Sequence, residues 1–273
     1  MPEAPKRVRA VRVAPGSRVD LGKRAPNDRL GLRSREQGER VMASHADALA
    51  ELSARLAASR TRALLVVLQG MDASGKDGTV RRCMDPFNPM LLRVAAFKAP
   101  SARELAHDFL WRIKLELPER GQIGIFNRSH YEDVLVPRVD ELVPKHVWRG
   151  RYDIINGFER GLTEEGTTIL KVFLHISPEE QAKRFRARIA DRRKNWKFTV
   201  DDLEKRKQWD DYMKAYAEAL ERTSTEWAPW HVVPADRKWV RNVVITELLV
   251  DALEGMHLEY PPLDPALRDV TVT

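Results

Sequence analysis

A short apolar run that leads directly into a glycine-rich segment sets the framework of this chain. Ala63–Leu68 is rich in branched residues and does not alternate, as expected for a strand buried on both faces of a parallel sheet. Gly70–Gly78 follows at once, and a helical pattern comes after it. A strand, a glycine-rich turn and a helix in this order predict a βαβ unit and parallel β-structure.

Four more short apolar runs recur, at Leu92–Phe97, Ile123–Phe126, Ile169–Ile176 and His231–Val233. Helical patterns lie around and between them, over residues 34–59, 78–84, 103–117, 131–139, 153–162, 178–220 and 240–256. This alternation predicts a three-layer α/β/α fold with a mainly parallel five-stranded sheet. The first long helix should begin at Ser34, which with Gln37 resembles a capping box.

The length of 273 residues accommodates one large α/β domain with short additions. Residues 1–33 are rich in Pro, Gly and Arg, and we interpret them as a basic N-terminal arm, either extended or a partly ordered wrap. A single domain is expected at 34–257 and a C-terminal tail at 258–273. The helical stretch at 178–220 is longer than a crossover needs, so we interpret it as an excursion over one edge of the sheet.

Composition excludes several classes of protein. The single cysteine, Cys83, excludes a disulfide framework and any multi-cysteine metal site. No apolar run approaches the roughly 20 residues of a membrane span. No secretory segment follows Met1, so we expect a cytoplasmic protein without a membrane partner.

Positive charge is clustered in two places. The formal net charge is +7, and residues 1–33 hold nine Lys/Arg against three acidic residues. Residues 183–207 hold eleven Lys/Arg against four acidic residues. This clustering predicts a polyanionic partner, whereas the alternative interpretation is a solvated helix face.

The glycine-rich segment fits the pattern G-x-x-x-x-G-K and lies between a strand and a helix, where a phosphate-binding loop belongs. An ordinary glycine-rich turn is the alternative. The backbone N–H groups of such a loop turn toward an oxyanion, and Lys76 adds a mobile positive charge. Asp77 stands where the magnesium-binding Ser/Thr usually follows the lysine. Asp72 inside the loop is expected to hold a divalent cation, because phosphate alone would repel it; a simple turn cap is the alternative.

A second polar group follows the run Ile123–Phe126. The strand-end position is an amide, Asn127, and not the acidic residue that usually completes a magnesium site. Arg128 is expected to bind phosphate or to pair with an acid. The nearest carboxylates, Glu132 and Asp133, should fall in the first turn of a helix, and His130 is assigned a structural role.

At these residues the sequence resembles the family-2 polyphosphate kinases. The resemblance rests on four blocks, Gly70–Gly78, Phe126–Leu135, Asn195–Phe198 and Pro234–Trp239, and it covers about residues 34–257. It implies a P-loop kinase-like core, a basic helical lid at about 178–220, magnesium (with manganese as an alternative), and phosphoryl transfer between inorganic polyphosphate and AMP, ADP or ATP, with guanine nucleotides also considered. With Asn127 at the end of the strand, the sequence resembles the subgroup that accepts both AMP and ADP. That resemblance implies that Asp133, in place of a strand-end acid, supplies the metal-binding carboxylate. A homo-oligomer is also expected.

These considerations predict a site with several parts. The catalytic residues are Asp72, Lys76, Arg128, Glu132 and Asp133, of which Asp72 and Asp133 hold the metal. The phosphate-binding residues are Gly70, Ala73, Ser74, Gly75, Lys76, Asp77, Gly78, Arg128, Arg188, Lys194 and Lys197. The nucleotide-binding residues are Phe97, Lys98 and Asn127.

Two other functions remain open from the residues. An ATP-dependent nucleoside monophosphate kinase would share the loop, but it would ordinarily keep Ser/Thr after Lys76. A basic nucleic-acid-binding protein with a vestigial loop is disfavoured, because no aromatic recognition motif appears. Core packing is the expected role of Trp196, Trp209, Trp227, Trp230 and Trp239, and no nucleic-acid partner is expected.

Overall fold

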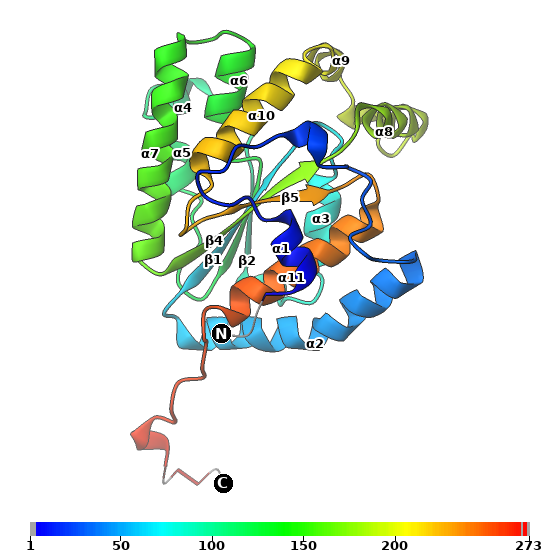
Figure 1. The fold of residues 1–273 in the computed structure, drawn as a ribbon. Coiled ribbons are helices and arrows are strands. Elements are labelled where there is room, and N and C mark those ends of the chain that lie inside the picture. The colour runs from blue at the N-terminus through cyan, green and yellow to red at the C-terminus, as the bar shows by residue number, and fades with distance from the viewer. Residues whose placement is uncertain (1–3, 269, 272–273) are drawn as a thin grey trace.

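The computed structural model describes residues 4–268 and 270–271. Its centre is one sheet of five parallel strands in the order β2-β3-β1-β4-β5 (Figure 1). The strands are β1 (Ala63–Gln69), β2 (Leu92–Ala96), β3 (Ile123–Asn127), β4 (Thr167–His175) and β5 (Trp230–Pro234). The predicted five-stranded α/β fold is therefore confirmed.

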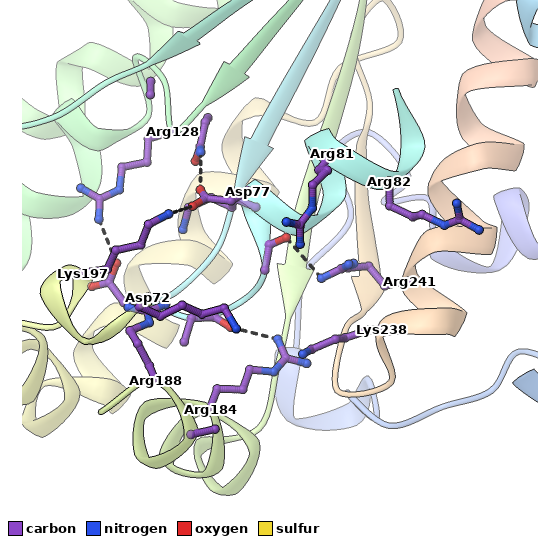
Figure 2. Close-up of a pocket in the computed structure, with 18 of the residues that line it drawn as sticks. Asp72, Asp77, Arg81, Arg82, Arg128, Arg184, Arg188, Lys197, Lys238 and Arg241 are labelled. Carbon is purple, nitrogen blue, oxygen red and sulfur yellow. Dashed lines mark hydrogen bonds and ion pairs between the residues drawn. The ribbon is translucent and has the colours of Figure 1, made fainter. Parts of the chain in front are cut away.

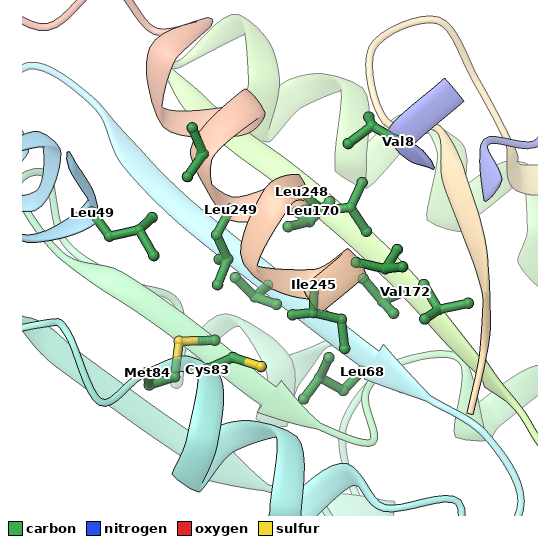
Figure 3. Close-up of a cluster of buried hydrophobic side chains, with 14 of the residues drawn as sticks. Val8, Leu49, Leu68, Cys83, Met84, Leu170, Val172, Ile245, Leu248 and Leu249 are labelled. Carbon is green, nitrogen blue, oxygen red and sulfur yellow. The ribbon is translucent and has the colours of Figure 1, made fainter. Parts of the chain in front are cut away.

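Helices cover both faces of the sheet, and each face has its own apolar core. On one face α2 (Arg35–Ser59), α3 (Lys76–Cys83) and α11 (Lys238–Glu254) enclose a cluster that includes Leu49, Leu68 and Ile245 (Figure 3). On the other face α5 (Trp111–Lys114), α6 (Glu132–Val139), α7 (Lys145–Glu164) and α10 (Trp209–Thr223) pack over Phe126 and Phe173. All seven residues of β1 are buried, which explains its unalternating apolar sequence.

Helix α2 begins where the sequence predicts. The Ser34 hydroxyl accepts a hydrogen bond from the Gln37 backbone N–H at 3.2 Å. The second half of the expected capping box differs, because the Gln37 side chain accepts from the Arg33 N–H at 2.7 Å.

The single helix predicted over 103–117 is wrong. Two short helices, α4 (Ala102–Leu105) and α5, occupy this stretch. Between them the Asp108 carboxylate accepts from the Leu110 N–H at 3.1 Å. Aspartate side chains compete in this way with the helical backbone, and the turn redirects the chain.

The helical excursion over 178–220 consists of several pieces. It contains α8 (Pro178–Ala190), a short 3₁₀ helix (Asn195–Lys197), α9 (Val200–Lys207) and most of α10. Figure 1 shows α8 and α9 projecting beyond the edge of the sheet. We call residues 178–207 the lid segment.

The N-terminal residues pack on the domain. Helix α1 (Lys6–Val11) buries Val8 and Val11 and pairs Arg7 with Glu247 of α11. Further along, the Pro26 carbonyl accepts a hydrogen bond from the Asp236 N–H at 3.1 Å. Short 3₁₀ turns lie at Leu21–Lys23, Pro89–Leu91 and Pro265–Leu267.

After α11, Met256 and Leu258 are still buried in the apolar core. The described residues beyond Tyr260 run away from the domain (Figure 1). Within the part of the chain that the structure describes, none of the helices is long and apolar enough to cross a membrane.

Candidate active site

A cleft of about 1710 Å³ opens at the carboxyl ends of the strands, between the glycine-rich loop and the lid segment (Figure 2). Parallel α/β folds bind ligands at this edge of the sheet. Six acidic residues and fourteen basic residues line the cleft; the basic residues are Arg35, Lys76, Arg81, Arg82, Lys98, Arg128, Arg184, Arg188, Arg193, Lys194, Lys197, Lys205, Lys238 and Arg241. The cleft therefore attracts anions.

The loop between β1 and α3 depends on two glycines. Gly70 has a φ of 147° and Gly75 a φ of 107°, both in the region that favours glycine. A Cβ on Gly70 would also lie 2.8 Å from the carbonyl oxygen of Leu174. The loop delivers the chain into α3 at Lys76, so that backbone N–H groups of the helix start face the cleft.

The Lys76 side chain lies inside the loop. Its Nζ donates hydrogen bonds to the carbonyl of Gly70 at 2.7 Å and to that of Met71 at 3.3 Å. Burial lowers the pKa of Lys76 to about 8. The Lys76 ammonium is therefore held where an incoming phosphate would contact it. Because its pKa is about 8, it begins to lose its proton just above neutral pH.

Asp72 and Arg128 form an ion pair across the cleft floor. Arg128 Nη2 lies 2.8 Å from Asp72 Oδ1. Arg128 itself has a φ of 65°, an unusual conformation for a non-glycine residue. Burial would raise the pKa of Asp72, but the charges of Lys76 and Arg128 prevail and lower it.

Glu132 lies at the same place. It lines a small pocket beside the main cleft together with Asp72, Arg128, Lys205 and Tyr212. The structure thus brings together four of the five predicted catalytic residues: Asp72, Lys76, Arg128 and Glu132.

Asp133, the fifth, does not line the cleft. Its carboxylate pairs with Arg112 at 3.4 Å and with Arg151 at 3.8 Å. Burial raises the pKa of Asp133, although Arg112 opposes the shift. Arg112 also donates to the Lys98 carbonyl at 2.8 Å, which connects Asp133 to the predicted nucleotide site.

Asp77 and Asn127 are in direct contact. Asn127 Nδ2 donates to Asp77 Oδ1 at 2.8 Å, and Lys197 Nζ of the lid segment lies 3.2 Å from Asp77 Oδ2. Phe97 is tied to the same place, because its N–H donates to the Asn127 carbonyl at 3.1 Å. The three predicted nucleotide-binding residues, Phe97, Lys98 and Asn127, all line the cleft.

Basic residues that sequence reasoning missed contribute much of the cleft. Arg184 donates to the carbonyls of Ala73 and Ser74, and Arg241 donates to that of Gly75 at 3.2 Å. Arg81, Arg82 and Lys238 line the cleft together with the lid residues Arg188, Lys194 and Lys197. The sequence signals available for these residues were the Arg81-Arg82 pair shortly after the loop and the block Pro234–Trp239, which contains Lys238.

Two expectations about buried side chains have mixed outcomes. His130 lies outside the cleft with its Nε2 3.1 Å from the buried Glu159 carboxylate, as a structural role requires. Trp230 is buried, but the prediction of core packing is wrong for Trp196 and Trp227, which are 72% and 40% exposed. Trp196 lines the cleft, so its position is explained by the cleft and not by the core.

The parallel sheet, the glycine loop and the basic cleft at the strand ends together define an enzyme of the P-loop kinase type. A family model described as "Polyphosphate kinase 2" matches residues 32–261. The chain belongs to this family, and it is a phosphotransferase. Phosphotransferases of this family generally need a divalent metal.

Individual relatives agree with this assignment. The chain is 46% identical to the AMP/ADP-polyphosphate phosphotransferase of Meiothermus ruber, covering 96% of this chain and 98% of the relative. It is 44% identical to an ADP-polyphosphate phosphotransferase of Rhodopseudomonas palustris, over 94% of this chain and 93% of the relative. The crystal structure of polyphosphate kinase 2 from Arthrobacter aurescens matches with a TM-score of 0.91 and 43% identity, over 96% of this chain and 93% of that one.

Proposed function

We propose that this enzyme reversibly transfers a phosphoryl group from inorganic polyphosphate to AMP and ADP, giving ADP and ATP. The observation that carries the proposal is the lining of the cleft, where fourteen cations surround a glycine-rich phosphate loop. Polyphosphate has no base and no sugar, so charge and oxygen geometry are its only recognisable features. The names of the two relatives above support both acceptors.

The reaction follows from the groups on the cleft floor. An oxygen of the acceptor's phosphate attacks the terminal phosphorus of polyphosphate, and the bond to the shortened chain breaks. The acceptor is already ionised, so the step needs no general base. Lys76 and Arg128 stabilise the charge that develops on the transferred group, and Arg188 reaches the same cleft from the lid segment.

Magnesium is the proposed metal, with manganese as an alternative. The donor set fits a hard cation, because Asp72, Asp77 and Asn127, whose side chains carry carboxylate or amide oxygens, line the cleft beside the phosphate loop. None of the described residues forms a group of three or more His, Cys, Asp or Glu side chains that could hold a metal. This also fits magnesium, which is commonly held by one or two carboxylates together with substrate phosphates, and when bound it would neutralise phosphate charge.

Of the two predicted metal ligands, Asp72 and Asp133, this arrangement favours Asp72. The assignment of Asp133 stays a prediction, and its ion pairs favour a role in holding Arg112 beside the acceptor site. We also propose a single domain over 34–257 whose lid closes over bound substrates. The homo-oligomer, guanine nucleotide acceptors and cytoplasmic location stay predictions from the sequence.

The test is a donor and acceptor matrix. AMP, long-chain polyphosphate and magnesium should yield ADP first and ATP afterwards, followed by chromatography without added nucleotide kinase. Conversion of ADP with inert AMP would restrict the acceptor range. Reaction of AMP with ATP but not with polyphosphate would instead establish the ATP-dependent kinase, and salt-sensitive RNA binding without transfer would establish the nucleic-acid alternative.

A further inference from the structure

The chain leaves β3 through a buried turn that carries Arg128. Arg128 has a φ of 65°, and its N–H donates to the Leu68 carbonyl at 3.0 Å. The next three side chains, Ser129, His130 and Tyr131, are almost completely buried. A positive φ at a residue with a Cβ costs free energy and persists only where the surroundings enforce it. The contacts of these three side chains therefore help to hold Arg128 in its conformation.

The turn is anchored on two sides. On one side Ser129 Oγ accepts a hydrogen bond from Gln69 Nε2 of β1 at 3.0 Å. On the other side Glu159 Oε1 of α7 lies 3.1 Å from His130 Nε2 and accepts from the Tyr131 hydroxyl at 2.8 Å. A carboxylate of this kind only accepts, so His130 is the donor. One oxygen atom of Glu159 thus holds two consecutive side chains of the turn.

The second oxygen of the same carboxylate holds a buried lysine. Glu159 Oε2 is 2.5 Å from Lys171 Nζ of β4, and both side chains are completely buried. Lys171 also donates to the Tyr131 hydroxyl at 2.9 Å and to the Thr223 carbonyl, at the end of α10, at 2.7 Å. Burial alone would raise the pKa of Glu159, but the charge of Lys171 prevails and lowers it. The carboxylate is therefore ionised, with hydrogen-bond donors on both of its oxygens.

Stability alone does not explain this network. A buried ion pair can often be replaced by apolar side chains without loss of stability, whereas a fully hydrogen-bonded polar network fixes one geometry. Here that geometry concerns the active site. Helix α6 begins at Glu132, directly after the turn. Helix α10 brings Tyr212 and Tyr216 to the small pocket that Arg128 also lines, so the network joins the elements that converge on Arg128.

We propose that Glu159 is a positioning residue for phosphoryl transfer, which fixes the turn after β3 and so holds the Arg128 guanidinium at the transferred group. It acts through His130 and Tyr131, and Lys171 orients its carboxylate. Glu159 is completely buried, so it cannot touch a substrate itself. This inference rests on the proposed function for the role of Arg128.

The first test replaces the carboxylate by an amide. The side chain of Glu159→Gln has one acceptor oxygen, which cannot serve both the turn and Lys171. The kcat for ATP formation from ADP and polyphosphate should fall by about 10- to 100-fold, as a misplacement of about 1 Å can cause. The KM values for both substrates should change little, since the other cations of the cleft stay in place. Adding Lys171→Met should restore most of kcat, because the amide oxygen can then face His130 and Tyr131.

A double-mutant cycle separates positioning from general damage. If Glu159 acts through Arg128, Glu159→Gln should cause no further loss of kcat in an Arg128→Ala background, because residues that act as one unit are not additive. The matched control is Glu247→Gln, which breaks the ion pair of another buried glutamate, with Arg7, outside the cleft. This control should lower the melting temperature and leave the kcat of the folded protein unchanged.

A second pair of variants tests the turn from its own side and covers the case in which Glu159→Gln does not fold. His130→Leu removes the hydrogen-bond donor to Glu159, whereas His130→Gln keeps an N–H for it. The kcat should fall in His130→Leu and be largely retained in His130→Gln. Equal kcat values in the two variants would contradict the inference.

Three further outcomes would overturn it: an unchanged kcat in folded Glu159→Gln, a loss expressed in KM instead of kcat, and the same fold-loss of kcat with and without Arg128. A crystal structure of Glu159→Gln adds a readout that does not depend on activity. In it Arg128 Nη2 should no longer lie 2.8 Å from Asp72 Oδ1, and an unmoved Arg128 would also overturn the inference. Wild-type protein that makes no ATP from ADP and polyphosphate would refute the proposed function, whereas a displaced Arg128 in the variant would still establish the positioning by Glu159.

Discussion

Arg184 of α8 donates a hydrogen bond to the backbone carbonyl of Ser74 at 2.8 Å, so a side chain of the lid segment fixes the phosphate loop. The same guanidinium donates to the carbonyls of Ala73, Ala235 and Asp236 at 2.9, 2.6 and 3.0 Å. The loop, the start of the lid and the turn before α11 therefore share one anchor.

Arg184→Ala should lower both kcat and the melting temperature, because several partly buried carbonyls lose their donor at about 1–3 kcal/mol for each group left unsatisfied. Arg184→Lys should recover little, since an ammonium cannot reproduce the planar set of donors. Steady-state kinetics and thermal unfolding measure the two effects. Arg186→Ala on the exposed face of the same helix is the matched control, and an equal loss there would contradict the anchor.

Lys76→Ala should reduce the rate by about 10²–10³-fold, as loss of an electrostatic partner in a dry site does. Thermal unfolding should show a folded protein, because Lys76 contacts loop carbonyls and not the apolar core. Near-normal turnover in a folded variant would exclude the phosphate contact.

The lowered pKa of Lys76, about 8, gives a pH dependence with a definite sign. Above pH 8 the free enzyme loses the charge that phosphate requires, so kcat/KM for polyphosphate should fall. In stability the sign is opposite: between pH 8 and the ordinary pKa of 10.5 the unfolded chain binds more protons, so this residue's contribution to stability rises with pH. Lys76→Arg should move the basic limb of kcat/KM to higher pH, and an unmoved limb would assign it to another group.

Asp133→Asn tests whether this carboxylate binds metal or organises arginines. The structure predicts a lower melting temperature and a raised KM for the nucleotide, because Arg112 and Arg151 lose their partner and Arg112 holds the Lys98 carbonyl. Excess magnesium should leave these defects unchanged. Rescue by magnesium, with little effect of Asn127→Ala, would instead establish Asp133 as the ligand.

The two ends of the cleft should contribute differently to the binding of long and short donors. Figure 2 shows Arg82 far from Arg128 and Lys197, at the other end of the residues drawn. Arg81→Gln with Arg82→Gln should therefore raise the KM for long polyphosphate more than for triphosphate. Arg188, Lys194 and Lys197 changed to Gln should raise the KM for both donors more than the KM for ADP. The KM of the wild type for each of the two polyphosphate donors should also rise with salt concentration, because salt at physiological strength screens charges beyond about 8–10 Å. A KM independent of salt would contradict electrostatic binding of polyphosphate by these residues.

The strands and the loop were predictable because their signals are local. A strand buried on both faces needs a continuous apolar run, and β1 has one; the turn after it needs glycine at Gly70 and Gly75. The broken helix at Asp108 was not predictable from periodicity, since one side-chain hydrogen bond decided it.

The site was predictable only in part, because partners distant in sequence determine what a charged side chain does. Asp133 has the same sequence context whether it faces a metal or Arg112 and Arg151. Arg241 lies in α11, where most of the residues near it in sequence are buried. Its hydrogen bond to the Gly75 carbonyl depends on the packing of α11 against α3. Helical spacing gave no indication that Trp196 faces the cleft.

The hydrogen bond between the Pro26 carbonyl and the Asp236 N–H has a practical consequence for anyone who trims this enzyme. Asp236 also accepts a hydrogen bond from the Ser177 hydroxyl at 2.9 Å, just before α8, so Asp236 links the N-terminal residues to the start of the lid segment. The family model matches residues 32–261, and a recombinant fragment cut to those limits would lack the hydrogen bond from Asp236 to Pro26. Such a fragment should refold with a loosened lid hinge, and minimal versions for biocatalysis should keep the residues upstream of 32.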